Sequence, residues 1–539
     1  MNESLFHDLT TKNGVAFWKK WNSLNKAGNL LSSRVNGETD EQNIANEFAS
    51  YFESVYSGSE DEVYSTLKQK FITDFASYYA NHINDTISPY YVTWSEMLDV
   101  AAKIKIGKAS AGILRPEHFL FGAPELLRHL QHLFNGMIQH SFVPTEFVNG
   151  TITPIVKDSQ GDVSSPSNYR GITLSCLPAK LFEFIIQKKT SHLLGTDELQ
   201  FGFKSRTSTS HAIYTLKTTI DYFNQRGSSV YVAFLDCSKA FDRISHYGLF
   251  SKLIERRIPL CILMCLIFWY ANMTCCVKWG NDKSRRFEIP LGIKQGGINS
   301  PDFFSCYFDG LVQLLRKSQI GCHMYKLYLG IILFADDICL LAPTRSALQS
   351  LINMSASYCH KQGLNFNPRK SKVLVFSKKK IDFSILSPIL LNGDVVQFSP
   401  AITYLGVLIE SDRGFCVSAT NDLRSFYRAA NSVLSALHKP SEEVLMQLLY
   451  TNCVPIITYA CGVKSYSARD MSDCNTAINN SIRKIFTFHR WESVRSLRES
   501  LGFQSVYDIF ARTTENFHKL MAVHQNSVLR QIYLNNCLL

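Results

Sequence analysis

Two adjacent aspartates, Asp336 and Asp337, interrupt an apolar stretch of the chain. Ile-Ile-Leu-Phe precedes them at 331–334 and Ile-Cys-Leu-Leu follows at 338–341, so the pattern predicts a hairpin in a buried sheet. An unpaired buried carboxylate is costly, and two side by side also repel each other. Turn chemistry explains one aspartate at such a tip more readily than two. A divalent cation would remove the penalty, and Mg²⁺ prefers carboxylate oxygens.

A third carboxylate from another strand would complete such a metal site. The apolar run Val230–Leu235 predicts a fully buried strand, and Asp236 follows it directly. Asp242 is the other candidate nearby, but we expect it to act structurally, as an acid near a helix N-terminus. The predicted metal ligands are therefore Asp236, Asp336 and Asp337. Three aspartates around two divalent ions suit nucleotidyl transfer; nucleases use similar clusters, so the carboxylates alone leave the direction of the reaction open.

The aspartates belong to an ordered series of motifs. Phe334-Ala335-Asp336-Asp337 resembles the F/Y-x-D-D box of reverse transcriptases. The other motifs that resemble this family are, in chain order, Pro154–Lys157 and Asn168–Ile172, Gln200–Phe203 with Ser208-Thr209, Phe234–Asp236 with Ala240–Asp242, Lys294–Gly296 with Ser300-Pro301, Gly363–Ser371, and Tyr404–Gly406. The first two of these, Pro154–Lys157 and Asn168–Ile172, resemble the fingers motifs of non-LTR (LINE-type) retrotransposon reverse transcriptases rather than retroviral ones. The resemblance covers about residues 90 to 410.

The resemblance implies an RNA-directed DNA polymerase that uses Asp236, Asp336 and Asp337 as catalytic and metal-binding residues. Within the adjacent pair, Asp336 is the expected direct ligand. The implied cofactor is Mg²⁺, as two ions, with Mn²⁺ as a substitute. The implied partners are an RNA template, a DNA primer and dNTPs.

The resemblance also assigns roles around the aspartates. Phe241 lies five residues after Asp236, where the family places the ring that excludes a ribose 2′-hydroxyl; the alternative is a buried aromatic at a helix start. The remaining implied nucleotide-binding residues are Lys157 and Arg170 for the triphosphate, Gln295 and Gly296 for the template and nascent base pair, and Lys370 for the departing pyrophosphate; the implied primer grip is Tyr404, Leu405 and Gly406. For Lys157 the alternative is an ordinary solvated surface lysine.

The expected fold class is α+β, a right-hand polymerase with fingers, a palm built on an antiparallel sheet, and a helical thumb. We expect an N-terminal extension over 1–91 with an acidic amphipathic helix, fingers and palm over 92–410, and the helical thumb and C-terminal region over 411–539. The apolar run Leu260–Ala271 is too short to span a bilayer and predicts a buried helix.

Composition agrees with an intracellular nucleic-acid enzyme. The chain of 539 residues has a formal net charge of +11, which suits a polyanionic partner. Its 15 cysteines are scattered without a Cys-x-x-Cys pair, as in proteins with reduced thiols. The polar N-terminus resembles no signal peptide, so we expect no secretion, no membrane span, and a soluble ribonucleoprotein in the nucleus or cytoplasm. Lys361–Lys380 holds seven bases and no acid, and predicts either a strand or turn edge that carries lysines or a phosphate-facing surface.

Some positions depart from the family pattern. Gly107–Ile113 lacks the usual x-D-G step, Lys294 replaces an arginine, and Gly171 replaces a proline. The family's N-terminal endonuclease is absent, so we expect the nicking activity to be supplied elsewhere. The alternative function is a catalytically silent nucleic-acid-binding remnant of such an element; a two-metal nuclease is disfavoured by the motifs around the aspartates.

Overall fold

The computed structural model describes most of the chain. The described residues are 2–11, 14–24, 32–58, 62–122, 124–158, 161–379, 381–382, 385–411, 414–436 and 441–537. They form a mixed fold of helices and mainly antiparallel sheets, so the α+β prediction is confirmed.

The helices and strands follow one another in an irregular order along the chain. The helices are α1 Asn2–Thr10, α2 Gly14–Leu24, α3 Glu41–Tyr56, α4 Glu62–His82, α5 Trp94–Ala101, α6 Pro116–Leu120, α7 Pro124–His140, α8 Thr145–Val148, α9 Leu177–Thr190, α10 Thr209–Gln225, α11 His246–Glu255, α12 Leu260–Ala271, α13 Ser300–Ser318, α14 Arg345–Lys361, α15 Thr420–Ala436, α16 Glu442–Leu448, α17 Val454–Thr458, α18 Ala468–Ile485, α19 Arg495–Ser500, α20 Val506–Ala522 and α21 Ser527–Cys537. The strands are β1 Asn149–Val156, β2 Tyr169–Leu174, β3 Val230–Leu235, β4 Thr274–Trp279, β5 Asp282–Lys283, β6 Phe287–Glu288, β7 His323–Met324, β8 Leu327–Tyr328, β9 Ile331–Phe334, β10 Asp337–Ala342, β11 Lys372–Phe376, β12 Ile389–Leu391, β13 Asp394–Phe398, β14 Ala401–Tyr404, β15 Val407–Glu410 and β16 Cys416–Val417.

A six-stranded sheet with the order β12-β13-β11-β3-β10-β9 contains the strands predicted around the aspartates. The predicted strand over 230–235 is β3, and it pairs antiparallel with both β10 and β11. Because β3 has a neighbour on each side and helices pack against it, its side chains are almost all buried, which explains the continuous apolar run. The predicted hairpin is also confirmed as β9 and β10.

The lysine-rich segment contributes an interior strand of this sheet. β11 lies between β3 and β13, and its residues Val373 to Phe376 are buried. The strand-edge alternative was therefore wrong. Of the bases in this segment, only Lys372 lies in β11, whereas Arg369 and Lys370 lie in the turn before it, as a turn edge predicts. Lys380 lies outside the described residues.

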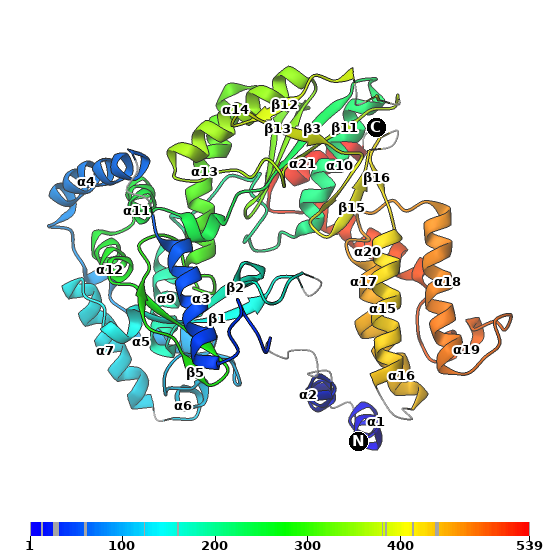
Figure 1. The fold of residues 1–539 in the computed structure, drawn as a ribbon, viewed down its shortest axis with the longest axis horizontal. Coiled ribbons are helices and arrows are strands. Elements are labelled where there is room, and N and C mark those ends of the chain that lie inside the picture. Colours follow the sequence, from blue (N-terminus) through cyan, green and yellow to red (C-terminus); the bar gives the residue numbers. More distant parts are fainter. Residues whose placement is uncertain are drawn as a thin grey trace.

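Helices cover both sides of the six-stranded sheet (Figure 1). α14 contacts β10, β3 and β12, whereas α10 contacts β9 and β3 and in turn packs against α21. The predicted buried helix over 260–271 is α12, with the same bounds. Among the described residues, no helix has both the length and the apolar character needed to cross a membrane.

A second sheet, with the order β2-β1-β4-β5 and β6 paired to β4, packs against α3. The predicted acidic amphipathic helix is α3: Phe48 and Phe52 are buried, and the Phe48 ring lies 4.9 Å from the rings of both Tyr169 and Trp279. On its acidic side, Glu53 forms an ion pair with Arg285. Aromatic packing therefore stabilises one side of α3, and the ion pair with Arg285 forms on the other side.

A separate core in the helical region unites segments from both ends of the sequence. Leu5, Phe17 and Trp21 of α1 and α2 are buried in the same core as Phe426 of α15 and Val444 of α16. Helix α21, in contrast, belongs to the main core through Val528, Leu529 and Ile532. The first helices therefore pack with the helical region, and the last helix packs with the sheet.

Gly171 occupies a place where α3 lies close to the second sheet. A Cβ atom there would lie 2.9 Å from Cε1 of the Phe52 ring and 3.1 Å from Cγ2 of Ile152. The Phe52 side chain is buried, so its ring has little room to move away. The glycine that replaces the family's proline therefore makes room for the aromatic side of α3.

We expect Gly171→Ala to lower the free energy of unfolding by about 1–3 kcal/mol, because a well-packed core absorbs an extra methyl group poorly. Chemical denaturation measures this change. Gly136→Ala on α7 is the matched control: a Cβ meets nothing within 4 Å there, so alanine should not destabilise the helix. Adding Phe52→Leu to Gly171→Ala should restore part of the loss; equal stability of parent and Gly171→Ala would contradict the packing argument.

Candidate active site

The aspartate pair lies at the tip of a very tight hairpin. Phe334 pairs with Asp337, so only Ala335 and Asp336 form the loop between β9 and β10. Ala335 adopts φ 56°, the left-handed conformation that primed two-residue turns require and that alanine adopts at a cost. Gln200 stabilises this loop, since its Oε1 accepts a hydrogen bond of 3.2 Å from the Ala335 N–H.

The segment 199–202 lies directly against this hairpin. Phe201 N–H donates to the Leu333 carbonyl (2.8 Å), and Leu333 N–H donates to the Leu199 carbonyl (2.9 Å). These bonds satisfy backbone groups on the open edge of β9, the last strand of the sheet. A Cβ on Gly202 would lie 2.3 Å from the backbone nitrogen of Ala335. The sequence motif Gln200–Phe203 therefore supports the catalytic turn, a role that sequence reasoning did not assign.

The third aspartate comes from the neighbouring strand. Leu235 of β3 pairs with Ile338 of β10, so the next position places Asp236 opposite Asp337. The backbone of Asp236 is fixed on both sides: its N–H donates to Ser371 Oγ (3.2 Å), and its carbonyl accepts from the Asn367 N–H (2.9 Å). The motif Gly363–Ser371 thus holds the end of β3 in place.

The three carboxylates influence one another electrostatically. The pKa of Asp337 is raised to about 6, mainly by burial and also by the charges of Asp336 and Asp236. Burial and the charge of Asp236 also raise the pKa of Asp336, whereas a backbone hydrogen bond and Arg170 oppose this rise. Both side chains of the pair reach solvent at the hairpin tip, so a cation from solution has access to them.

A set of three repelling carboxylates has the donor chemistry that Mg²⁺ prefers. Within the described ranges, no three His, Cys, Asp or Glu side chains are already gathered closely enough to hold a metal ion. Binding a shared ion would therefore require Asp236, Asp336 and Asp337 to turn their carboxylates toward it. The strand ends fix the backbone positions, and the side-chain torsions remain adjustable.

A cavity of about 390 Å³ opens beside the aspartates. Its lining includes Asp236, Asp337, Lys370, Tyr404 and Leu405. The structure therefore brings the predicted primer grip and the predicted pyrophosphate lysine to the same cavity as two of the three aspartates. A positive side chain facing the carboxylates across this cavity suits a ligand that carries phosphate groups.

The predicted primer grip is a second tight hairpin. Tyr404 pairs with Val407, and the loop residues Leu405 and Gly406 have φ values of 47° and 78°, as a two-residue primed turn requires. The Tyr459 hydroxyl, at the end of α17, donates to the Leu405 carbonyl (3.1 Å). The same hydroxyl lies 2.7 Å from Thr209 Oγ1 at the start of α10, so one tyrosine connects the grip to two other elements.

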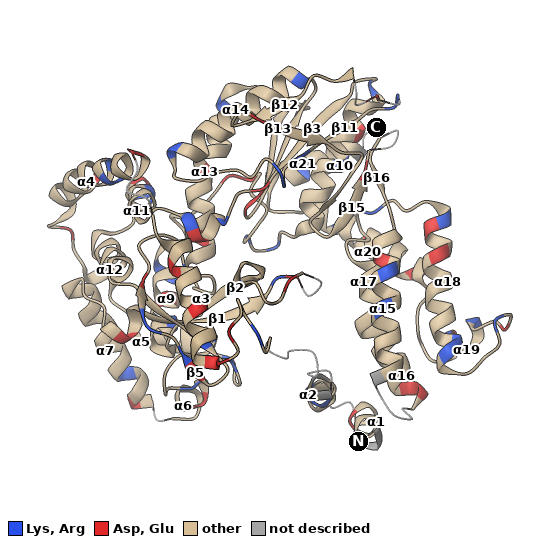
Figure 2. Ribbon diagram, in the orientation of Figure 1, with Lys and Arg blue, Asp and Glu red and all other residues tan. Residues whose placement is uncertain are grey.

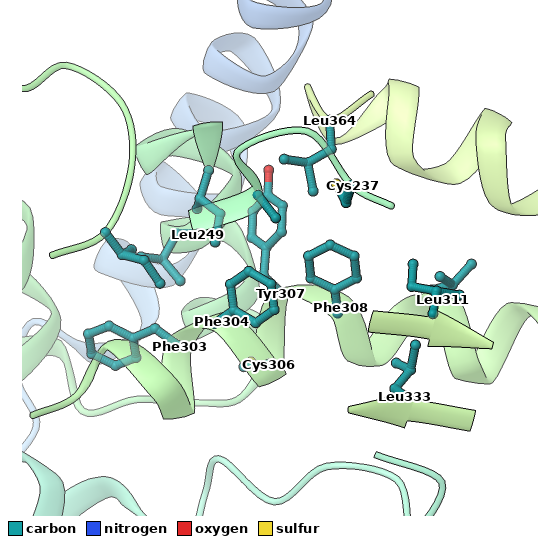
Figure 3. Packing of buried hydrophobic residues seen from close by; sticks show 14 of the residues in the cluster. Cys237, Leu249, Phe303, Phe304, Cys306, Tyr307, Phe308, Leu311, Leu333 and Leu364 are labelled. Atoms are coloured by element: carbon teal, nitrogen blue, oxygen red, sulfur yellow. The ribbon is translucent and has the colours of Figure 1, made fainter. Parts of the chain in front are cut away.

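Phe241 lies at the end of a stack of aromatic rings. Its ring lies parallel to that of Phe304, with centroids 4.1 Å apart, and meets the ring of Phe203 edge-on at 5.9 Å. Phe304 stacks in turn on Phe308, 4.8 Å away on the same helix, α13. Figure 3 shows Phe304 and Phe308 among the buried residues of α13, with Leu333 of β9 nearby. Phe241 itself is half-buried, so one part of the ring remains available to a ligand.

Asp242 has a different structural role from the one predicted. It lies in a single 3-10 turn, Ala240–Arg243, and the N-cap of the following helix α11 is Ser245. Its Oδ1 instead accepts a hydrogen bond of 2.7 Å from Gln295 Nε2. Burial raises the pKa of Asp242, and the bond from Gln295 opposes this rise. Asp242 therefore orients Gln295.

Gln295 and Gly296 lie against β2. The Gln295 carbonyl accepts from the Thr173 N–H (2.8 Å), and Gly296 has φ 117°. A Cβ on Gly296 would lie 2.9 Å from the Thr173 carbonyl oxygen, so this position requires glycine for both conformation and space. The exposed Gly296 leaves the backbone open to a ligand.

Lys157 directly follows β1, and Arg170 lies on β2; both are exposed. Lys157 Nζ donates to the Ser167 carbonyl (3.0 Å). Burial lowers the pKa of Lys157; Asp242 opposes this shift, while Arg170 and Lys370 strengthen it. These interactions place a group of basic side chains near the aspartates, since Arg170 also acts on Asp336.

Comparison with known proteins identifies the region that contains this site. Residues 155–409 match the protein family described as "Reverse transcriptase (RNA-dependent DNA polymerase)". A Pol polyprotein from the type-1 retrotransposable element R2 of Nasonia vitripennis is 26% identical over 52% of this chain and 28% of its own length. A probable RNA-directed DNA polymerase from transposon BS of Drosophila melanogaster is 23% identical over 75% of this chain and 45% of its own length. The chain thus spans less than half the length of these two relatives.

Among solved structures, telomerase from Candida albicans matches with 12% identity and a TM-score of 0.38, over 91% of this chain and 96% of that one. The family match covers all of the motifs from Ile155 to Ile409 described above, including the three aspartates. The resemblance to non-LTR retrotransposon reverse transcriptases is confirmed by the family match of residues 155–409 and by relatives named as RNA-directed DNA polymerases of transposons.

The close approach of Gly202 to the hairpin gives a direct test of the turn. We expect Gly202→Ala to reduce primer extension at least 100-fold, because the new methyl group meets backbone and must displace Ala335 and with it Asp336. The measurement is extension on an RNA template beside thermal unfolding of the same sample. Gly195→Ala, where a Cβ meets nothing within 4 Å, should behave like the parent; full activity of Gly202→Ala would show that the turn tolerates displacement.

Proposed function

We propose that this reverse transcriptase domain is the RNA-directed DNA polymerase of a non-LTR retrotransposon, which extends a DNA 3′-hydroxyl on an RNA template. The observation that carries the proposal is the meeting of two strand ends: Asp236, directly after β3, lies opposite Asp337 at the start of β10. The cavity beside them is also lined by Lys370 and Leu405. Relatives named as RNA-directed DNA polymerases, such as that of transposon BS, support the reaction class.

The three aspartates would hold two Mg²⁺ ions, for which Mn²⁺ could substitute. When bound, the ions would lower the pKa of the attacking 3′-hydroxyl and neutralise the pyrophosphate that leaves. The residues of the chain determine where this happens: Asp236, Asp336 and Asp337 bind the ions, and the rigid turns at Ala335 and Leu405 fix the aspartates relative to the primer end.

Basic residues would position the incoming dNTP. Lys157 and Arg170 extend from β1 and β2, and Lys370 lines the cavity with the aspartates. Arg170 can contact phosphate oxygens in a bidentate manner, whereas each lysine supplies a point charge. Lys370 would stabilise the departing pyrophosphate. The orientation of Gln295 by Asp242 would support the template base opposite the dNTP.

The substrates are those of a polymerase that works on nucleic acids inside the cell. The RNA template, DNA primer and dNTPs would occupy the region between the aspartates, the primer grip and β1–β2, and the protein would act as a ribonucleoprotein in the nucleus or cytoplasm.

We expect Asp336→Ala to abolish primer extension, because a metal ligand is lost, and to leave the fold intact or slightly more stable, because one of three repelling carboxylates is removed. Extension by purified protein with Mg²⁺ and dNTPs on an RNA template, together with thermal unfolding, measures both effects. Asp394→Ala is the control, since Asp394 directly follows a two-residue hairpin loop of the same sheet, as Asp337 does, but lies at β12–β13. Equal, measurable extension by Asp336→Ala and the parent would exclude the metal assignment, whereas no extension by the parent would favour a silent binding protein.

We expect Phe241→Ala to admit ribonucleotides, because a ring held rigidly by Phe304 leaves no space for a 2′-hydroxyl. The rNTP-to-dNTP incorporation ratio should rise about 10-fold or more, or about 1.4 kcal/mol of lost discrimination. Single-nucleotide extension with dCTP and rCTP on one template measures this ratio. Phe308→Leu, which disturbs the same aromatic stack away from Phe241, should lower stability without changing the ratio; an equal change in both variants would assign Phe241 to packing alone.

A further inference from the structure

The loop 486–494 between α18 and α19 exposes an unusual aromatic surface. The Trp491 side chain is 80% exposed, while the other five tryptophans of the chain are buried or half-buried. The His489 ring stacks on the Trp491 ring, with centroids 4.8 Å apart and an interplanar angle of 2°. This stacking presents the indole as a fixed flat surface, because the loop is also closed by a hydrogen bond from the Glu492 N–H to the His489 carbonyl (3.1 Å).

A polar cavity of about 330 Å³ lies beside this loop. Ser493 and Val494 of the loop form part of its lining, and Arg483, Arg495 and Arg498 supply three guanidinium groups. We call this cavity, which Arg483, Arg495 and Arg498 help to line, the arginine cavity. Arg483 Nε donates to the Glu492 carbonyl (2.9 Å), so the cavity and the loop that carries Trp491 are joined directly.

Arg498 is a buried residue of this cavity with a hydrogen-bond donor that has no partner, as an anion-binding site requires. Its side chain is 92% buried, since only 8% of the residue is exposed, and its Nε has no hydrogen-bond partner. One of its other nitrogens donates to Asn479 Oδ1 (3.3 Å). A buried guanidinium with an unused N–H is costly unless an acceptor arrives, and phosphate oxygens are the acceptors that arginine binds best.

The charges around the arginine cavity favour an anion. Five bases and one acid lie between Arg483 and Arg498, and Figure 2 shows Lys and Arg at the end of α18 and on α19. The acids that face the cavity already have partners: Glu499 pairs with Arg495 (2.9 Å), and Asp508 accepts from the Ser505 hydroxyl (2.6 Å). Their charges are therefore partly neutralised, and Arg498 remains available.

This surface is remote from the proposed polymerase site. In Figure 1 the orange loop between α18 and α19 lies at the right edge of the molecule, with α15 and α17 between it and the two sheets. A strand bound there would not compete with a primer and template at the aspartates.

We propose that Trp491 and the arginine cavity form a second binding site for single-stranded nucleic acid, in which one base stacks on Trp491 and adjacent phosphates bind Arg495 and Arg498. Stacking on an aromatic ring tolerates any base, and basic residues beside the ring follow the backbone. The chemistry is common to RNA and DNA strands. The site goes beyond the proposed function, since it requires no catalysis.

The test is binding of fluorescein-labelled ten-nucleotide RNA and DNA, oligo-U and oligo-dT, to the full chain. Fluorescence anisotropy is measured in EDTA, with an excess of unlabelled short primer–template duplex to occupy the polymerase site. We expect Trp491→Ala to weaken binding of at least one of the two strands about 5-fold or more, and Trp491→Phe to restore most of it. We expect Arg495→Ala to weaken binding and to reduce the log–log salt slope by about 0.7, the value for one phosphate contact on a single strand.

Arg469→Ala, an exposed arginine at the opposite end of α18, is the control and should bind like the parent. Extension of a short duplex should stay within about 2-fold of the parent for Trp491→Ala, because the site is separate from the aspartates. Unchanged binding of both strands by Trp491→Ala would overturn the proposal, and so would a parallel loss of extension on the short duplex. Since binding is measured without Mg²⁺, an inactive polymerase would not affect the result.

Discussion

The repulsion among three carboxylates is the constraint on which the rest of the structure depends. The charge of Asp236 raises the pKa of both Asp336 and Asp337, and Asp336 also raises the pKa of Asp337, so side-chain attraction cannot hold these carboxylates together. The backbone holds them instead. A two-residue turn fixes the pair, and Ser371 with Asn367 fixes the end of β3. The free energy needed for this comes from the large apolar core beneath the sheet.

Much of the surrounding architecture supports these few backbone positions. Gln200 and the segment around it close the edge of β9, and the aromatic side of α13 supports Phe241 beside β3. The C-terminal helix α21 reaches the same region, because Ser527 and Asn526 hydrogen-bond to Glu198, two residues before Gln200. A chain of direct contacts therefore connects the last helix of the sequence to the turn that carries Asp336.

The sequence predicts those parts of the structure that depend on local pattern. The strand β3, the β9–β10 hairpin and the helix α12 follow from runs of apolar residues, and the ordered motifs name the residues that gather around the aspartates. The bond from Gln295 to Asp242 was not predictable, because the two residues are 53 positions apart and no local pattern records their contact. The interior place of β11 was missed for a similar reason: the lysines flanking it suggested an edge, whereas pairing with distant strands determines its position. The spacing of Gln200 and Gly202 was visible in the sequence, and a glycine after a buried glutamine could have suggested a close backbone approach.

The packing of α1 and α2 against the helical region has a consequence for how the protein is made. Leu5, Phe17 and Trp21 leave the ribosome long before their partners in α15 and α16, which are more than 400 residues further along the chain. At a synthesis rate of about 5–20 residues per second, roughly 20–90 s pass before the surface that covers these apolar side chains has been made. The apolar sides of α1 and α2 therefore stay uncovered until α15 and α16 have been synthesised. During translation they depend on chaperones or on temporary contacts within the nascent chain.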